Sequence, residues 1–280
     1  MQKAVDWLDL WRELSKRQEE AWQAGEAKDR EDGWRTRATG FDAEVKRRWA
    51  TRDSSRDFVA ARLQANPEWS ALDIGGGTGA WAVFMGRIAR QVTVIEPSSA
   101  MIEVMRRNLA EANLHTVEIV QKKWPEAEVN KHDLTLCSHA MYGFSDLAMF
   151  ARSIETVTRR ICVLILRCPT PDDLLCVASL HIWGQPYDSP NFQVAYNALL
   201  QMGIFPNVLM EDSGLWEPWT NTSLDEAFAE AKRRLGLQQD PRHDDFLHNL
   251  LSHNLIYREG RFVWPRSMRS ALLYWTPVQR

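Results

Sequence analysis

Apolar and polar positions along the chain follow two periods that alternate with each other. Short, mainly apolar runs occur at residues 71–74, 92–95, 117–120, 134–137 and 161–166, and such runs are typical of strands in a parallel sheet. Between them, apolar residues recur every three to four positions, which is the spacing of an amphipathic helix. This alternation predicts an α/β fold built on a parallel sheet.

The N-terminal part precedes this alternation and reads as helical. Residues 4–24 place Trp7 and Trp11 on one face of a predicted amphipathic helix that ends near Gly25. That face either packs on the rest of the chain or forms a lid over a substrate pocket. Residues 26–57 carry many charges of both signs, which predicts a solvated pair of helices with apolar anchors. The alternative is that an arginine of this segment binds the carboxylate of a cofactor or of an acidic substrate.

A glycine-rich turn connects the first predicted strand to the helix after it. Residues 70–84 read as strand, loop and helix, and the loop contains Gly75, Gly76, Gly77 and Gly79. Glycine lets the backbone turn sharply and lets a ligand approach it without a Cβ in the way. The start of the helix also offers free N–H groups. The loop alone is not specific, because its spacing also satisfies the G-x-G-x-x-G/A fingerprint of dinucleotide-binding proteins.

Two acidic residues make the pattern more specific. Asp73 lies two residues before the first glycine, where a dinucleotide-binding strand is normally apolar. Glu96 ends the next predicted strand, where a carboxylate can accept two hydrogen bonds from ribose hydroxyls. With the glycines and the sequence Glu-Pro-Ser-x-x-Met at 96–101, this pattern resembles the class I S-adenosylmethionine-dependent methyltransferases. The resemblance extends over roughly residues 58–167. In the rest of the chain, only the order of the predicted elements resembles the family.

This resemblance implies a Rossmann-like, seven-stranded, mostly parallel sheet with helices on both faces, an N-terminal helical segment and helical insertions. It implies S-adenosylmethionine as cofactor and S-adenosylhomocysteine as product. It divides the chain into a helical lid or cap segment at 1–57 and a methyltransferase domain at 58–280, with insertions at about 168–189 and 213–258. The residues expected to bind the cofactor are Asp73, Gly75, Gly76, Gly77, Gly79, Glu96, Pro97, Met101, Trp124, Ser138 and His139.

Two of these assignments have alternatives. Met101 either contacts the ribose or adenine of the cofactor or packs between its helix and the sheet. Members of the family often carry an acidic residue after the third strand that binds the adenine amino group. The matching place departs from this pattern and holds Lys122, Lys123 and Trp124. Trp124 either stacks on the adenine or packs against the edge of the sheet.

Polar side chains follow the fourth predicted strand, at 133–138. In this fold ligands bind beyond the carboxyl ends of the strands, so Ser138, His139 and Tyr142 are expected to face the methyl group and its acceptor. His139 is the candidate general base because an imidazole titrates near neutral pH, and Tyr142 is a second candidate catalytic residue. The alternative is that His139 only hydrogen-bonds the backbone or shapes the pocket.

The segment after the fifth predicted strand is longer than a turn requires. Residues 168–189 contain several prolines and are expected to lie over the mouth of the pocket. His181 and Trp183 in this segment are therefore, together with Tyr142, the candidate substrate-binding residues.

The insertion at 213–258 is predicted to contain two helices. The first begins at a capping box, Ser-Leu-Asp-Glu at 223–226. Residues 261–264 and 268–275 are expected to finish the sheet. Three histidines of the second helix are spaced by five, whereas ligands on one helix face need steps of three or four. No metal site is therefore predicted from His243, His248 and His253.

Composition limits the class of protein. A length of 280 residues with 45% hydrophobic content allows one large domain, with or without a cap. A net charge of −3 gives no general basic field, so no nucleic-acid partner is expected. The four cysteines form no C-x-x-C pair and are expected to be reduced core thiols in a cytoplasmic protein. The sequence shows no signal core and no membrane-spanning run. The oligomeric state stays open, and a dimer is compatible with the pattern.

Methyl transfer from a sulfonium is an in-line displacement, for which an enzyme mainly supplies orientation and a desolvated pocket. The aromatic-rich additions predict a small, partly apolar acceptor molecule. One alternative is a protein or RNA methyltransferase, although the chain has no Asn/Asp-Pro-Pro-Tyr signature. Another is a non-catalytic protein that binds S-adenosylmethionine or a partner. An NAD-dependent enzyme is a more distant alternative, which titration with both cofactors distinguishes. The pattern does not identify the acceptor atom.

Overall fold

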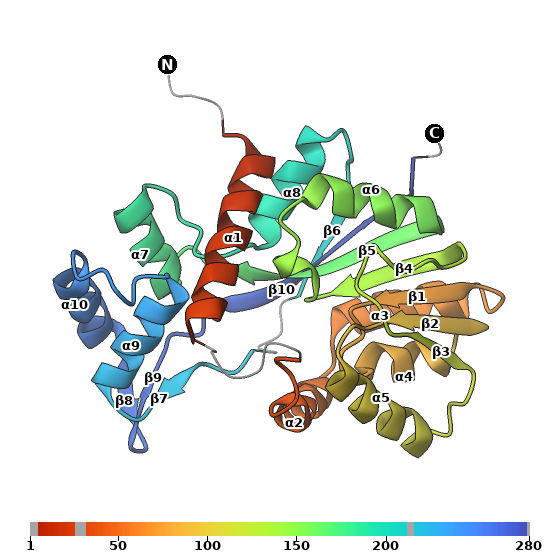
Figure 1. Cartoon of the computed structure of the whole chain (residues 1–280), viewed down its shortest axis with the longest axis horizontal. Coiled ribbons are helices and arrows are strands. Elements are labelled where there is room, and N and C mark those ends of the chain that lie inside the picture. The colour runs from red at the N-terminus through yellow and green to blue at the C-terminus, as the bar shows by residue number, and fades with distance from the viewer. Residues whose placement is uncertain (1–4, 26–31, 212–215, 279–280) are drawn as a thin grey trace.

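A seven-stranded sheet forms the centre of the molecule (Figure 1). The structure is a computed structural model that describes residues 5–25, 32–211 and 216–278. In spatial order, the strands are β3 (Val117–Val120), β2 (Gln91–Ile95), β1 (Ser70–Ile74), β4 (His132–Ser138), β5 (Thr158–Pro169), β10 (Met268–Trp275) and β6 (Asn207–Met210). Only β10 is antiparallel to its neighbours within this sheet. The predicted Rossmann-like, mostly parallel sheet is thereby confirmed.

Helices cover both faces of the sheet, as predicted. Alternate residues of β1 point to opposite sides: Ala71 belongs to one core cluster and Leu72 to the other. The Ala71 face is covered by α3 (Ser54–Gln64), α4 (Ala80–Gly86) and α5 (Ser99–Glu111). The Leu72 face is covered by α1 (Trp7–Gly25), α6 (Leu147–Val157) and α8 (Phe192–Gln201).

The helix α1 is part of the core. Trp11 and Leu14 are fully buried, which confirms the apolar face predicted for this helix. The Trp11 indole N–H donates to the Phe144 carbonyl oxygen at 2.7 Å, just after the 3₁₀ turn η1 (Met141–Gly143). The next helix, α2 (Ala38–Trp49), packs against α5. The order of these elements places the N-terminal segment against both faces of the sheet.

A second group of elements lies on the far side of α1 from the main sheet (Figure 1). It consists of α7 (Leu174–Trp183), α9 (Leu224–Arg234), α10 (Asp244–Asn254) and a sheet of β7 (Thr220–Asn221), β9 (Arg261–Val263) and β8 (Ile256–Arg258). We call this group the accessory layer. It has its own apolar core, which includes Leu175, Ala231 and Trp264. The helices predicted in the insertion at 213–258 are confirmed, with Ser223 capping α9 through the Glu226 N–H.

The prediction that residues 261–264 join the main sheet was wrong. They form β9, which pairs with β8 and β7 in the accessory layer. The reason is the turn between β8 and β9, where Glu259 and Gly260 have φ angles of 52° and 78°. Two consecutive residues with positive φ close a tight antiparallel hairpin, so the chain turns back on itself before it reaches β10.

Three findings concern the chain as a whole. A division into domains stays a proposal and, because α3 crosses residue 57, a boundary would have to fall before Ser54.

All four cysteines are buried and free. Within the described residues, no helix combines the length and apolar character needed to cross a bilayer, and no group of three or more His, Cys, Asp or Glu side chains is placed to hold a metal ion.

Candidate functional site

The glycine loop between β1 and α4 is tightly packed at the carboxyl edge of the sheet. Gly75, Gly77 and Gly79 have φ angles of 74°, 55° and 87°, in the region that favours glycine. A Cβ on Gly75 would lie 2.3 Å from the Cβ of Ala140, which follows β4. A Cβ on Gly76 would meet Val94 at 2.2 Å. The loop therefore brings bare backbone close to the end of β4, as the sequence predicted.

Asp73 is an unusual carboxylate for the interior of a sheet. It is 1% exposed, and among the described residues its Oδ2 atom has no hydrogen-bond partner. Burial, followed by the nearby charge of Glu96, raises the pKa of Asp73 to about 7. A buried oxygen without a partner costs free energy. Such an oxygen beside an open glycine loop fits a ligand that brings a positive charge or a hydrogen-bond donor.

Glu96 stands at the end of β2 and faces the same loop. Its Oε2 atom accepts from the Gly77 N–H at 2.8 Å, and its Oε1 atom accepts from the Ser98 N–H at 2.9 Å. A carboxylate has about four acceptor positions, so both oxygens can accept further hydrogen bonds, for example from ribose hydroxyls. Burial raises its pKa. Pro97, the next residue, is exposed.

The N-terminal segment contacts this part of the site through Asp32, a residue that was not singled out from the sequence. Asp32 accepts hydrogen bonds from the Ser98 hydroxyl at 2.8 Å and from the Ala100 N–H at 3.0 Å, so it helps to cap α5. Met101 is 2% exposed and packs with Ala38 of α2. The packing alternative therefore describes Met101, although its partner is the N-terminal segment as well as its own helix.

Trp124 lies in the core. It is 5% exposed, and its indole N–H donates to the Ser153 hydroxyl of α6 at 2.9 Å. No face of the ring is open for a base to stack on, and the ring packs in the same cluster as Trp11. This placement favours the alternative in which Trp124 packs against the sheet, because an apolar ring with one hydrogen-bond donor is satisfied inside this core.

The structure brings His139 and Tyr142 together beyond the end of β4. The Tyr142 hydroxyl lies 2.9 Å from His139 Nδ1 and accepts the Arg167 backbone N–H at 2.7 Å. The hydroxyl oxygen accepts the Arg167 N–H and its own proton needs an acceptor, so we assign the hydroxyl proton to Nδ1 and the imidazole proton to Nε2. His139 has a φ of 55°, a strained value for a residue with a side chain.

The charge state of His139 follows from its surroundings. Burial, then the positive charges of Arg48 and Arg167, lower the pKa of His139 to about 3. The imidazole is therefore neutral at physiological pH, and it is a weak base. Its Nε2 atom lies 3.5 Å from the Ser270 hydroxyl of β10.

Several residues around His139 were not singled out from the sequence. The guanidinium of Arg48 stacks over Trp216 at 4.6 Å, and the His139 ring meets the same indole edge-on, with ring centroids 5.3 Å apart. The Trp216 indole N–H donates to Ser270 Oγ at 3.0 Å. A cavity of about 40 Å³ opens here. It is lined by Arg48, Trp49, Asp53, Trp81, Ser138, His139, Ile165 and Ser270.

The structure does not bring His181 and Trp183 to this cavity. His181 stacks on Phe246 of α10 with ring centroids 3.8 Å apart. Trp183 packs with the accessory core and lies under the Arg17 guanidinium at 4.2 Å. Residues 168–189 contain α7, whose apolar side chains pack on the helices of the accessory layer, so both rings lie in that layer. Their predicted role in substrate binding has no support from this placement.

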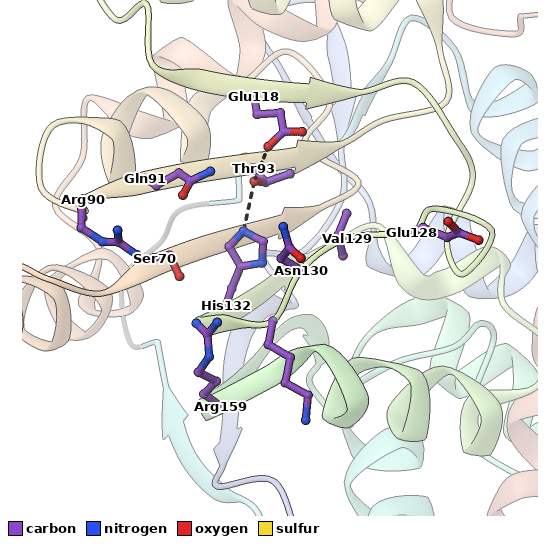
Figure 2. Close-up of a pocket in the computed structure, with 11 residues that line it drawn as sticks. Ser70, Arg90, Gln91, Thr93, Glu118, Glu128, Val129, Asn130, His132 and Arg159 are labelled. Atoms are coloured by element: carbon purple, nitrogen blue, oxygen red, sulfur yellow. Dashed lines mark hydrogen bonds between the residues drawn. The ribbon is translucent and has the colours of Figure 1, made fainter.

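A larger cavity, of about 700 Å³, lies at the opposite edge of the sheet (Figure 2). It is lined by residues at the amino ends of the strands, among them Ser70, Gln91 and His132. The His132 Nε2 atom and the Thr93 hydroxyl lie 3.0 Å apart in it. Ligands in open α/β sheets bind beyond the carboxyl ends of the strands. We therefore assign the functional site to the glycine loop and the His139 cavity.

Comparison with known proteins identifies the central part of the chain. Residues 71–160, from β1 to the start of β5, match the family model described as a methyltransferase domain. This match takes up about a third of the chain. The match and the fold support an S-adenosylmethionine-dependent methyltransferase, with S-adenosylmethionine as cofactor. No curated protein matches the chain significantly.

Solved structures share the fold of this methyltransferase domain. The plantazolicin methyltransferase BpumL in complex with SAH is 13% identical, with a TM-score of 0.54, and the match covers 98% of this chain and 99% of that one. A putative methyltransferase from Bacillus halodurans is 15% identical, with a TM-score of 0.50 and coverage of 79% and 99%. The YcgJ protein from Bacillus subtilis is 14% identical, with a TM-score of 0.50 and coverage of 81% and 99%.

The residues at the carboxyl edge fit this cofactor. S-adenosylmethionine carries a sulfonium and an ammonium group as well as ribose hydroxyls. The buried, unpartnered Asp73 oxygen suits the positive charges, and the Glu96 carboxylate suits the hydroxyls. The glycine loop leaves its backbone accessible between them.

Proposed function

We propose that the enzyme transfers a methyl group from S-adenosylmethionine to a small, partly apolar molecule. One observation supports this proposal: two features lie side by side at the carboxyl edge of the sheet. The glycine loop lies there with Asp73 and Glu96, and beside it lies a cavity whose walls include the rings of Trp49 and Trp81. The same cavity also holds polar side chains, among them Ser138 and His139, and aromatic walls combined with placed polar groups are typical of small-molecule sites.

The roles of the site residues follow from their contacts. In this proposal Glu96 binds the ribose, Asp73 and the glycine loop bind the methionine part, and Ser138 faces the reacting atoms. The bound cofactor supplies an activated methyl group, so the protein mainly aligns the acceptor and excludes water. The buried ring of Trp81 and the half-buried ring of Trp49 exclude water from that side of the cavity.

His139 acts as a hydrogen-bond donor that positions the acceptor. Its Nδ1 atom is engaged by the Tyr142 hydroxyl, so the proton on Nε2 points to the Ser270 side of the cavity. A histidine with a pKa near 3 is a poor general base at neutral pH. This assignment develops the alternative in which His139 shapes the pocket, with Tyr142 fixing its tautomer.

Substitution of His139 tests the donor role. Glutamine can place an N–H close to the position of Nε2, whereas alanine cannot. We expect His139→Ala to lower turnover by about 10- to 100-fold, the loss of one hydrogen bond to a charged or polarised group, with little change in cofactor affinity. His139→Gln should recover a large part of that rate. An equal loss in both variants, with a rate that follows the titration of a single group, would instead establish a general base.

The substrate class can be read from the fate of labelled methyl groups. The enzyme is incubated with S-adenosylmethionine carrying a labelled methyl group and a cell extract, which is then separated into small molecules, RNA and protein. Label in the small-molecule fraction supports the proposal. Label confined to RNA or protein would overturn it, and cofactor binding by calorimetry without transfer would identify a non-catalytic binding protein. A Glu96→Gln variant, which we expect to bind the cofactor weakly, controls for unspecific labelling.

A further inference from the structure

The cavity beside His139 has a positive charge on its wall that, among the described residues, has no carboxylate partner within 4 Å. We propose that Arg48 is an anion-binding residue and takes a carboxylate, either that of the methionine part of the cofactor or that of an acidic substrate. This inference rests on the proposed function, because it names the chemistry that one side of the same site recognises. The N-terminal segment thus contributes a binding residue to the site.

Arg48 differs from the other half-buried arginines in having no polar partner. It lies in the last turn of α2, and among the described residues no carboxylate lies within 4 Å of its guanidinium and no hydrogen bond reaches it. Its one close contact is the face of Trp216. By contrast, Arg56 donates to the Trp49 carbonyl at 2.7 Å, and Arg234 pairs with Glu230 at 2.6 Å. Arginines this deep in a protein are normally paired.

The donors around Arg48 match a carboxylate. The hydroxyls of Ser138 and Ser270 and the Nε2 atom of His139 line the same cavity. With the Nε2 proton assigned above, His139 offers a donor to this space. The guanidinium adds a planar set of donors that suits two carboxylate oxygens. A volume of about 40 Å³ leaves room for a group of a few atoms.

Asp53 and Glu44 act electrostatically on Arg48, but among the described residues neither lies within 4 Å of its guanidinium. Asp53 also lines the cavity, but it caps α3 by accepting the Ser55 N–H at 2.7 Å. Burial and a hydrogen bond with Glu211 raise the pKa of Asp53, which weakens its negative charge. Glu211 in turn accepts from the Ser54 N–H at 2.6 Å, and Glu44 acts on Arg48 only at longer range. On the opposite side Arg167 adds positive charge, so the electrostatic balance at His139 favours an anion.

An anion at Arg48 also has a consequence for His139. Arg48 and Arg167 are the charges that hold the pKa of this imidazole low. A bound carboxylate would offset them and raise the pKa of the ring above its value in the free enzyme.

Calorimetry on an Arg48→Gln variant tests the proposal, with Arg47→Gln as the matched control, since Arg47 is exposed on the same helix turn. The first arm compares S-adenosylmethionine with 5′-methylthioadenosine, which lacks the amino acid part. If the cofactor supplies the carboxylate, Arg48→Gln should lose about 10- to 100-fold in affinity for S-adenosylmethionine and none for 5′-methylthioadenosine. The Arg47→Gln variant should bind both as the wild type does.

The second arm uses enzyme saturated with S-adenosylhomocysteine and titrated with benzoate or benzamide. If the substrate supplies the carboxylate, the wild type should prefer benzoate, and Arg48→Gln should lose that preference. Thermal unfolding shows whether the variant folds, and Arg48→Lys, which keeps the charge, should recover part of the affinity. Wild-type behaviour of Arg48→Gln in both arms would overturn the Arg48 proposal and leave the proposed function standing. A wild type that binds neither cofactor form would overturn the proposed function, and the Arg48 proposal with it.

Discussion

At the scale of single residues, the site depends on buried charges that lack full compensation. Asp73 has an oxygen without a partner, and Arg48 has a guanidinium without a carboxylate among the described residues. Asp73 lies in β1 just before the glycine loop, and Arg48 lines the cavity beyond the end of β4. In a folded protein such groups are costly unless a ligand satisfies them. Their signs are complementary to S-adenosylmethionine, which carries positive charges and a carboxylate.

The titration of Asp73 should make cofactor binding depend on pH. In the free enzyme the pKa of Asp73 is about 7. A bound sulfonium and ammonium favour the ionised carboxylate and lower that pKa, so binding releases a proton. We therefore expect affinity for S-adenosylmethionine to be constant above pH 7 and to fall by about tenfold for each pH unit below it, measured by calorimetry at several pH values.

Two variants control this experiment. Asp73→Asn should bind more weakly at pH 8 and show a nearly flat profile, because amide groups do not titrate in this range. Asp172→Asn removes an exposed carboxylate far along the chain and should keep the wild-type profile. A profile that falls equally in Asp73→Asn would assign the titration to another group, such as Glu96, whose pKa burial also raises.

The two charges also show how far sequence reasoning reaches. Asp73 and Glu96 were predicted because a local pattern of strand, glycines and strand end fixes their positions. Arg48 could only be named as one of several arginines in a charged segment. Two features distinguish it: its contact with Trp216, more than a hundred positions later in the chain, and the absence, among the described residues, of a carboxylate within 4 Å of its guanidinium. No local sequence pattern contains either feature.

At the scale of elements, the alternating strands and helices of the main sheet could be predicted from the sequence. The N-terminal helix and the accessory layer were harder to predict. The strands β1 to β5 and their helices follow periodicities that are local in the sequence. The hairpin of β8 and β9 has strands of three residues and a charged turn, with Arg258, Glu259 and Arg261. Strands this short do not indicate which sheet they join. The helix α1 was predicted, but the sequence left open whether it packs on the rest of the chain or covers a pocket.

The burial of Trp11 in α1 makes the packing role testable. Its ring is fully buried between the helix and η1, and its N–H donates to a carbonyl oxygen. We expect Trp11→Ala to lower the free energy of unfolding by about 3–5 kcal/mol and Trp11→Phe by about 1–2 kcal/mol, measured by urea denaturation. A helix that only covered the pocket would leave the urea midpoint of Trp11→Ala unchanged and alter ligand release instead.

At the scale of the whole molecule, the tryptophans mark three regions. Of the 13 in the chain, Trp11, Trp124 and Trp275 lie in the core of the methyltransferase fold, and Trp183, Trp219 and Trp264 in the accessory layer. A third group surrounds the His139 cavity, where Trp216 contacts both Arg48 and His139. Trp216 follows β6 and precedes β7, so it connects the main sheet to the accessory layer. The additions to the fold therefore support two residues that line the site, Arg48 and His139, and also form a second apolar core.

This distribution predicts which tryptophan reports on ligand binding. S-adenosylhomocysteine bound beside His139 should change the environment of Trp216 and leave the rings of the accessory core unchanged. We expect the fluorescence change of the wild type on adding S-adenosylhomocysteine to be largely lost in Trp216→Phe and retained in Trp183→Phe, with affinity followed by calorimetry in both. Trp124→Phe should also retain it, because that ring is already buried in the core. Loss of the signal in Trp124→Phe but not in Trp216→Phe would restore the stacking of Trp124 on adenine and move the cofactor toward β3. The experiment thus distinguishes a cofactor that binds beside Trp216, next to the accessory layer, from one that binds beside Trp124, toward β3.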